Sequence, residues 1–338
     1  MYKKLILIFL CLSLILPILA ACKPKTQSQI YYEYFDTESV VFSYTGGSEK
    51  SFLSNCDAVK STLDKYHKLF DIYYEYSGIN NLKTVNKSAG KSPVKIDREL
   101  MDFLLWCKQV YTLTDGKVNV AMGSVLKIWH DYRESKSGVP TKEELTAASA
   151  HCDINSLVLD EEACTAYISD PLMSLDVGAT GKGYATEKAA EVLISRGVTS
   201  YVLNIGGNIR AIGTKRDGSD WKVGITHPNR SSDEQFIARV MISNTSLVTS
   251  GNYERYYTVD GIRYHHVIDP ETLMPSAYFS SVSIFTENSA LGDALSTALF
   301  CMSYEDGLRL VESIGGVEVI WVDNDYNVKS TQGVKWEY

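Results

Sequence analysis

The segment Asp176–Ala185, with the sequence DVGATGKGYA, combines glycines with a lysine where a strand passes into a helix. Backbone N–H groups at a glycine-rich helix start can approach an anion, the helix dipole favours negative charge there, and Lys182 adds a cation. The G-x-x-x-x-G-K-[ST] spacing of a Walker loop is absent. The segment indicates a phosphate site, with a glycine-rich packing turn as the alternative.

A second glycine-rich segment, Leu203–Ile209 (LNIGGNI), follows a predicted strand. Its backbone amides and the side chain of Asn204 could contact a ligand. The same sequence is also typical of a simple hairpin turn.

Asp293 and Thr297 lie in a predicted helix and are four residues apart, which places them on one helical face. A carboxylate and a hydroxyl at this spacing suit Mg²⁺, which takes oxygen ligands and completes its shell with water and substrate phosphate. The alternative is an Asp near the helix N-terminus beside an ordinary solvent-facing Thr.

His265 and His266 are adjacent, and Asp269 begins a turn just behind them. Neighbouring side chains on an extended strand point to opposite faces, so we expect the two histidines to have different roles. A histidine near a turn, with Asp269 available to orient it, is a candidate general base.

The elements that position these residues are predicted from periodicity. The expected helices cover residues 55–76, 98–113, 142–152, 182–196 and 291–302. The expected strands cover residues 38–44, 156–159, 163–168, 200–205, 221–225, 237–242, 246–249, 256–259, 281–286 and 316–322. Strands outnumber helices and often follow one another directly, which favours a single α+β domain over a doubly wound parallel sheet.

The N-terminus predicts export. Lys3 and Lys4 precede an apolar run over residues 5–16, and the segment ends in Leu-Ala-Ala-Cys. This ending resembles the bacterial lipoprotein signal, in which Cys22 would receive diacylglycerol and anchor the protein to the outer face of the cytoplasmic membrane. The alternatives are a simple membrane anchor or a chance cysteine. We therefore expect a signal peptide over 1–21, a lipidated spacer over 22–37 and a folded domain over 38–338.

The net charge bears on the class of partner, and the cysteines bear on disulfides and metal sites. The formal charge is −8, and it becomes −10 once Lys3 and Lys4 leave with the signal, which argues against a nucleic-acid partner. The five cysteines beyond Cys22 stand at irregular spacings and predict neither a disulfide framework nor structural zinc.

Six segments together resemble the ApbE-type FAD:protein FMN transferases. They are TDGKVNVAMGSVLKIW (114–129), DVGATGKGYA (176–185), LNIGGNIRAIG (203–213), TSGNYERYY (249–257), HHVIDPETLMPS (265–276) and GDALSTALF (292–300). The resemblance runs in order from about residue 38 to 330. It implies a compact ApbE-like domain of mixed or antiparallel sheets with packed helices.

The resemblance also implies a reaction. Members of that family use Mg²⁺, cleave FAD at its pyrophosphate, release AMP, and leave FMN joined by a phosphoester to Thr or Ser of exported redox proteins. It implies that Asp293, Thr297 and the main-chain oxygen of Ala179 bind the metal, and that His266 is catalytic. The implied FAD contacts are Gly178, Ala179, Lys182, Gly183, Asn204, Gly206, Gly207, Thr249, Ser250, Gly251 and Asp269.

The sequence departs from the family pattern at two places. Thr180-Gly181 stand where the family more often has Ile-Ala, and residues 119–124 replace its D-P-T-V-G-P pattern. These differences concern the flavin ring more than the phosphate chemistry. Two other functions fit the same residues: an FAD pyrophosphatase, in which water takes the place of the acceptor, and a non-catalytic flavin-binding lipoprotein.

Overall fold

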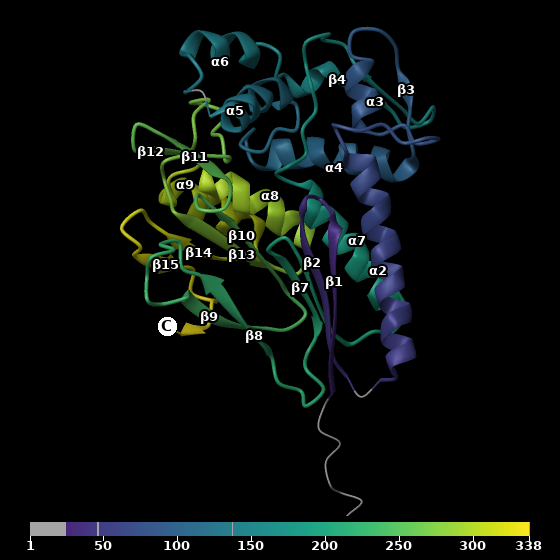
Figure 1. Ribbon diagram of the computed structural model, residues 1–338, viewed down its shortest axis with the longest axis vertical. Coiled ribbons are helices and arrows are strands. Elements are labelled where there is room, and N and C mark those ends of the chain that lie inside the picture. Colours follow the sequence, from purple (N-terminus) through teal and green to yellow (C-terminus); the bar gives the residue numbers. More distant parts are fainter. Residues whose placement is uncertain (1–24, 46, 137, 338) are drawn as a thin grey trace, which may run out of the picture.

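The computed structural model describes residues 25–45, 47–136 and 138–337, and an eight-stranded sheet runs through it (Figure 1). All neighbouring strands pair antiparallel. In spatial order the strands are β1 (Lys25–Tyr34), β2 (Thr37–Thr45), β6 (Ser200–Ile205), β7 (Asn208–Gly213), β10 (Ser246–Gly251), β13 (Ser281–Thr286), β14 (Glu318–Val322) and β15 (Val328–Ser330).

Three helices form a layer against one face of this sheet. They are α2 (Glu49–Phe70), α7 (Gly181–Ser195) and α8 (Ser289–Phe300). Helix α7 contacts β6 and β7, α8 contacts β10 and β13, and α2 packs on α7 (Figure 1). Because α8 lies between the sheet and other helices, ten of its twelve residues are buried.

A small sheet of β8 (Trp221–Thr226), β9 (Phe236–Ile242) and β16 (Trp336–Glu337) covers the other face. Trp221, Ile225 and Val240 of this sheet share one apolar cluster with Leu247 and Phe285 of the large sheet. Strand β13 is buried at every position, as expected for a strand that is covered on both faces.

The remaining elements lie beyond one end of the helical layer and along its side (Figure 1). The helices are α3 (Leu82–Lys87), α4 (Arg98–Leu113), α5 (Gly123–Ser135), α6 (Lys142–Ser149), the short 3₁₀ helix Ile154–Ser156 and α9 (Tyr304–Ile314). The strands are β3 (Val94–Lys95), β5 (Thr165–Ile168) and β4 (Leu157–Asp160), which pair in that order, and the hairpin of β11 (Tyr256–Val259) and β12 (Ile262–His265).

The prediction of a single α+β domain is confirmed, and α4 spans the predicted residues 98–113. The helix predicted over 55–76 is wrong at both ends, since α2 runs from Glu49 to Phe70. The side chain of Ser48 caps its N-terminus by accepting a hydrogen bond from Ser51. Beyond Phe70, the carboxylate of Asp71 accepts the N–H groups of Tyr73 and Tyr74, which turns the chain out of the helix.

The spacer predicted over 22–37 is also wrong, because residues 25–34 form strand β1. This strand pairs with β2 along nearly its whole length, and Tyr31 and Tyr34 bury their rings in the core. The alternating tyrosines at the end of the supposed spacer therefore belong to a sheet. The signal peptide over 1–21 and the lipidation site Cys22 lie outside the described residues.

Among the residues that the structure describes, no helix combines the length and the apolar character that crossing a membrane requires. The five cysteines of this part of the chain are free.

Candidate active site

The centre of the candidate site is the contact between the start of α7 and the start of α8. The N–H of Gly183 donates a hydrogen bond to Oδ2 of Asp293 at 2.7 Å, and Nζ of Lys182 lies 3.7 Å from Oδ1. A Cβ atom on Gly183 would stand 2.3 Å from the Cβ of Asp293 and 2.4 Å from the carbonyl oxygen of Ser289. The two helices can meet here only because residue 183 has no side chain.

The other two predicted metal ligands are Thr297 and Ala179. Asp293 is buried and Thr297, one turn later on α8, is half-buried. Ala179 packs against an apolar cluster that includes Ala294 and Ala298 of α8. The described residues hold no group of three or more His, Cys, Asp or Glu side chains that could bind a metal.

One carboxylate with a hydroxyl and a carbonyl oxygen nevertheless fits Mg²⁺. This ion is usually held by one or two carboxylates together with water and substrate phosphate, and not by a cage of protein ligands. Oδ1 of Asp293 accepts no hydrogen bond from the residues that the structure describes, and the Lys182 ammonium lies 3.7 Å away, so this oxygen is available to a cation.

A buried ion pair supports the contact between α7 and α8. Oε2 of Glu187 on α7 accepts the N–H of Ser289 at 2.6 Å and lies 3.3 Å from Nε of Arg210 on β7. Both side chains are less than one tenth exposed. Sequence reasoning missed this pair because nothing in the local sequence indicates that α7, α8 and β7 meet.

The serine and threonine segment on β10 reaches the same helix. The hydroxyl of Ser250 lies 2.8 Å from that of Ser296, which in turn donates to the carbonyl oxygen of Asp293. Thr249 pairs with Ser283 on β13, and Gly251 is buried under the ring of Tyr253. Ser250 is therefore the member of this segment that the structure joins to the predicted metal ligands.

The segment 203–209 forms the hairpin between β6 and β7. Oδ1 of Asn204 accepts the N–H of Gly207 at 3.0 Å, and both Gly206 and Gly207 have positive φ. A side chain on Gly206 would collide with Thr37 at the start of β2. The side-chain oxygen of Asn204 is thus engaged in the turn, while Asn208, which begins β7, has a buried amide nitrogen without a partner among the described residues.

His266 lies just past the end of β12 and is exposed, whereas His265 is buried. The expectation that the two rings face opposite sides is therefore confirmed. Nε2 of His265 lies 2.8 Å from the carbonyl oxygen of Ser276, and its Nδ1 accepts the N–H of Val267. His265 is a structural residue.

The carbonyl oxygen of Arg255 orients His266. It accepts the main-chain N–H of His266 at 3.0 Å and lies 3.2 Å from Nδ1 of the ring. If Nδ1 carries the proton that this contact requires, Nε2 is left as the free acceptor. The proposed orienting acid, Asp269, does not contact this ring, so that part of the sequence interpretation is wrong.

The neighbours of His266 keep its ring neutral. Desolvation by the surrounding protein lowers the pKa of His266 below its ordinary value, and the positive charges of Arg255 and Lys182 act in the same direction. The ring has access to solvent, which limits the desolvation, and the hydrogen bond with the Arg255 carbonyl raises the pKa, but His265, Arg255 and Lys182 all lower it. A neutral imidazole is the form that accepts a proton.

Asp269 supports the loop that follows His266. Its carboxylate is almost fully buried, accepts the N–H of Glu271, and lies 3.3 Å from Nζ of Lys117. These contacts use one carboxylate oxygen, Oδ1, and the expected contact between Asp269 and FAD stays a prediction.

Asp176 and Tyr73 are candidate ligand contacts that the sequence interpretation missed. Desolvation raises the pKa of Asp176, whose Oδ1 accepts the N–H of Gly178. Desolvation, and then the charge of Asp176, raises the pKa of Tyr73, whose ring is largely exposed. An exposed aromatic face near a carboxyl with a raised pKa can bind a heteroaromatic ring. The position of Asp176 at the head of the glycine-rich segment was the available signal.

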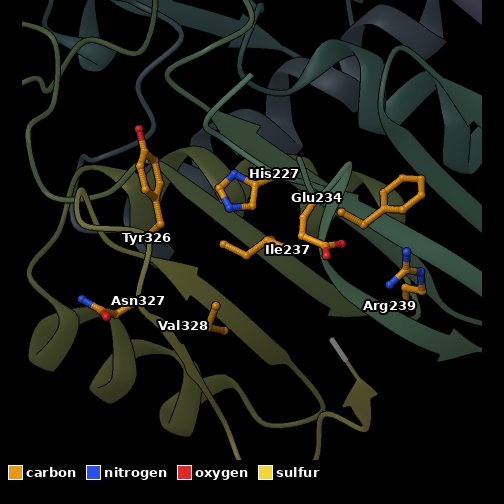
Figure 2. A pocket seen from close by; sticks show the side chains of 8 residues that line it. His227, Glu234, Ile237, Arg239, Tyr326, Asn327 and Val328 are labelled. Atoms are coloured by element: carbon orange, nitrogen blue, oxygen red, sulfur yellow. The ribbon is translucent and has the colours of Figure 1, made fainter. Parts of the chain in front are cut away.

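A separate cavity of about 690 Å³ lies between β9 and the residues that lead into β15 (Figure 2). Its lining residues are His227, Glu234, Phe236, Ile237, Arg239, Tyr326, Asn327 and Val328. None of them is a predicted site residue, so the cavity plays no part in the assignment of the site.

Comparison with known proteins identifies the family. The model of the ApbE family matches residues 34–321. An FAD:protein FMN transferase of Treponema pallidum is 33% identical over 267 residues, which cover 75% of this chain and 73% of that protein. An FAD:protein FMN transferase of Haemophilus influenzae is 26% identical over 333 residues, or 94% of this chain and 93% of that protein. The chain belongs to the ApbE family.

Solved structures agree with the fold. The crystal structure of the ApbE protein of Thermotoga maritima has a TM-score of 0.81 and 25% identity, and the match covers 91% of this chain and 97% of that one. The flavin transferase ApbE of Vibrio cholerae has a TM-score of 0.76 at 24% identity, with the same coverage. The mixed, largely antiparallel architecture predicted from the resemblance is confirmed.

Proposed function

We propose that this chain is a Mg²⁺-dependent FAD:protein FMN transferase that attaches FMN to a Thr or Ser hydroxyl of another protein and releases AMP. The observation that carries the proposal is the meeting of Lys182 and the glycine-rich start of α7 with Asp293, within electrostatic reach of a neutral His266. The names of the relatives in Treponema pallidum and Haemophilus influenzae support the same activity.

The pyrophosphate of FAD binds at the N-terminus of α7. The dipole of the helix and the ammonium of Lys182 both favour the phosphate charges there. Arg255, which has no acidic partner among the described side chains, adds positive charge on the side of His266. Negative phosphates would partly offset these cations, so substrate binding should bring the pKa of His266 back toward neutrality.

Asp293, Thr297 and the carbonyl oxygen of Ala179 would hold the Mg²⁺ ion. When bound, the ion neutralises the charge that develops on the phosphate oxygens. Asp293 keeps the hydrogen bond from Gly183 through Oδ2, so Oδ1 can serve the cation without disturbing the contact between the helices.

In the transfer step, the acceptor hydroxyl oxygen attacks the phosphorus atom on the FMN side of the pyrophosphate. A new P–O bond forms, and the bond from this phosphorus to the bridging oxygen breaks. The bridging oxygen keeps the electron pair and leaves as part of AMP. His266 takes the hydroxyl proton on Nε2, while the Arg255 carbonyl holds the ring in place.

The acceptors are exported or membrane redox proteins that carry a Thr or Ser flavinylation site. We propose that the enzyme meets them at the outer face of the cytoplasmic membrane, anchored by lipid on Cys22. The Leu-Ala-Ala-Cys sequence supports this location. In cells, Cys22→Ser should shift the protein from the membrane to the soluble fraction while its activity in solution survives. A variant that stays in the membrane fraction would refute the lipid anchor.

The function is tested by mixing the protein without residues 1–22 with FAD, Mg²⁺ and a candidate exported redox protein. The expected result is AMP release together with a mass increase of one FMN on the acceptor. AMP release without modification of any acceptor would instead support an FAD pyrophosphatase. Tight FAD binding without AMP release would support a non-catalytic flavin-binding protein.

A further inference from the structure

Lys117 belongs to the segment 114–129, to which the proposed reaction assigns no role. It lies in the linker between α4 and α5, and its side chain is only 11% exposed. Nζ lies 3.3 Å from Oδ1 of Asp269 and 2.9 Å from Oε1 of Glu271. The hydrogen bonds with these two carboxylates raise the pKa of Lys117, although desolvation opposes the shift. The linker is thus tied to the loop that follows His266.

The same linker is hydrogen-bonded to the segment that leads into the glycine-rich loop. The carbonyl oxygen of Val120 accepts the N–H of Asp176, and the N–H of Gly123 donates to the carbonyl oxygen of Ser174, both at 2.9 Å. A Cβ atom on Gly123 would lie 2.3 Å from that oxygen. Residues 174–176 therefore lie directly against the linker, two residues before Gly178.

Internal hydrogen bonds close the loop that follows His266. Asp269 accepts the N–H of Leu273 on its carbonyl oxygen, and Ser276 donates its N–H to Val267. The indole of Trp129 on α5 donates to the carbonyl oxygen of Leu273 at 2.9 Å. The loop is therefore a compact unit that contacts the linker through Lys117, α5 through Trp129 and the end of α8 through the Ser276 hydroxyl, which donates to the carbonyl oxygen of Phe300.

We propose that Lys117 is a positioning residue, which fixes His266 relative to the glycine-rich loop by joining the linker to Asp269. The linker then contacts both the loop that follows His266 and the segment that precedes the phosphate-binding loop, so that it helps to set the distance between them. This inference rests on the proposed function, because the role of His266 does.

The test compares three variants with the unmodified protein: Lys117→Arg, Lys117→Met and the double variant Lys117→Met/Asp269→Asn. Lys117→Met alone leaves a buried carboxylate without a partner and can fail to fold. The double variant removes the ion pair between the linker and Asp269 without leaving a buried unpaired charge. It therefore tests the proposal even if Lys117→Met does not fold. Lys65→Met is the matched control, since Lys65 pairs with Glu99 on an exposed surface.

We expect the double variant to fold and to bind FAD within about twofold of the unmodified protein, but to turn over at least tenfold more slowly. Lys117→Arg should recover most of the turnover, and Lys65→Met should change nothing. The ring resonances of His266 in an NMR spectrum, assigned by their loss in His266→Ala, should shift in the double variant and not in Lys65→Met.

Full turnover in a folded double variant would overturn the proposal. So would an unchanged His266 resonance, or a loss of turnover that follows a parallel loss of FAD binding. If the unmodified protein neither releases AMP nor transfers FMN, the proposed function fails. The His266 resonance still reports on the positioning in that case, because it does not depend on activity.

Discussion

The main-chain N–H of Gly183 donates its hydrogen bond to the carboxylate of Asp293, 110 positions later in the chain, at 2.7 Å. The bond directs a predicted metal ligand at the positive end of α7, beside the lysine that would meet the phosphates. Because a Cβ at residue 183 would stand 2.3 Å from Asp293, the same glycine controls both packing and chemistry.

Gly183→Ala should therefore destabilise the protein. Overpacking of a close contact typically costs about 1–3 kcal/mol, and the clash here is with the body of the neighbouring helix. Thermal unfolding measures the loss. Gly307→Ala on α9 is the control, since the nearest atom to its Cβ is a leucine methyl at 3.3 Å and alanine favours the helix. Equal midpoints for the two variants would contradict the structure at this contact.

Asp293→Asn should remove the charge of the metal ligand while leaving an oxygen to accept the Gly183 N–H. Loss of a residue that only supports a metal ligand typically costs about 10–100-fold in metal affinity. Loss of the charge on a direct ligand should cost at least as much, so the Mg²⁺ concentration for half-maximal activity should rise at least about 100-fold. Thr297→Ala should cost less, and Thr297→Ser should behave almost as the unmodified protein. Wild-type Mg²⁺ dependence in Asp293→Asn would remove Asp293 from the metal site.

His266→Ala should retain FAD binding and lose transfer. Removal of a general base typically costs about 10²–10⁴-fold in rate, and higher FAD concentrations should restore little of it. His265→Ala should behave in the opposite way, since its buried ring bonds the backbone of Ser276 and Val267 and its loss lowers stability. Rates of FMN transfer and thermal midpoints separate the two. A His266→Ala variant that fails only through weak FAD binding would make His266 a ligand contact.

Arg255→Gln should move the acid limb of the pH profile. The guanidinium is one of the charges that lower the pKa of His266, since a nearby cation disfavours the imidazolium. Removing that charge raises the pKa, so His266 becomes protonated at a higher pH and kcat/KM begins to fall earlier on acidification. The backbone carbonyl that orients the ring stays in place.

Arg230→Gln is the control for this profile. Arg230 lies near the same segment but is exposed and paired with Glu254. Its replacement should leave the acid limb unchanged. An unshifted limb in Arg255→Gln as well would show that the guanidinium does not act on His266.

Local sequence determined those parts of the site that depend on one element. The four-residue spacing of Asp293 and Thr297 places them on one face of α8 whatever surrounds the helix, and strand alternation separates His265 from His266. The periodic apolar residues of α4 predicted its ends correctly, since its buried face is encoded in the residues of the helix itself. The six ordered segments indicated the family, which the match over residues 34–321 then established.

Only the tertiary structure decided which residues meet across the chain. The acid nearest to His266 in the sequence, Asp269, pairs with Lys117, and the orienting group is the carbonyl of Arg255, which directly precedes the neighbouring strand β11. The polar composition of residues 25–34 is compatible with a spacer. They form a strand because they pair with the free edge of β2. Such pairings depend on which distant segments come together in space. Local periodicity describes only residues that are close in sequence, so it cannot reveal them.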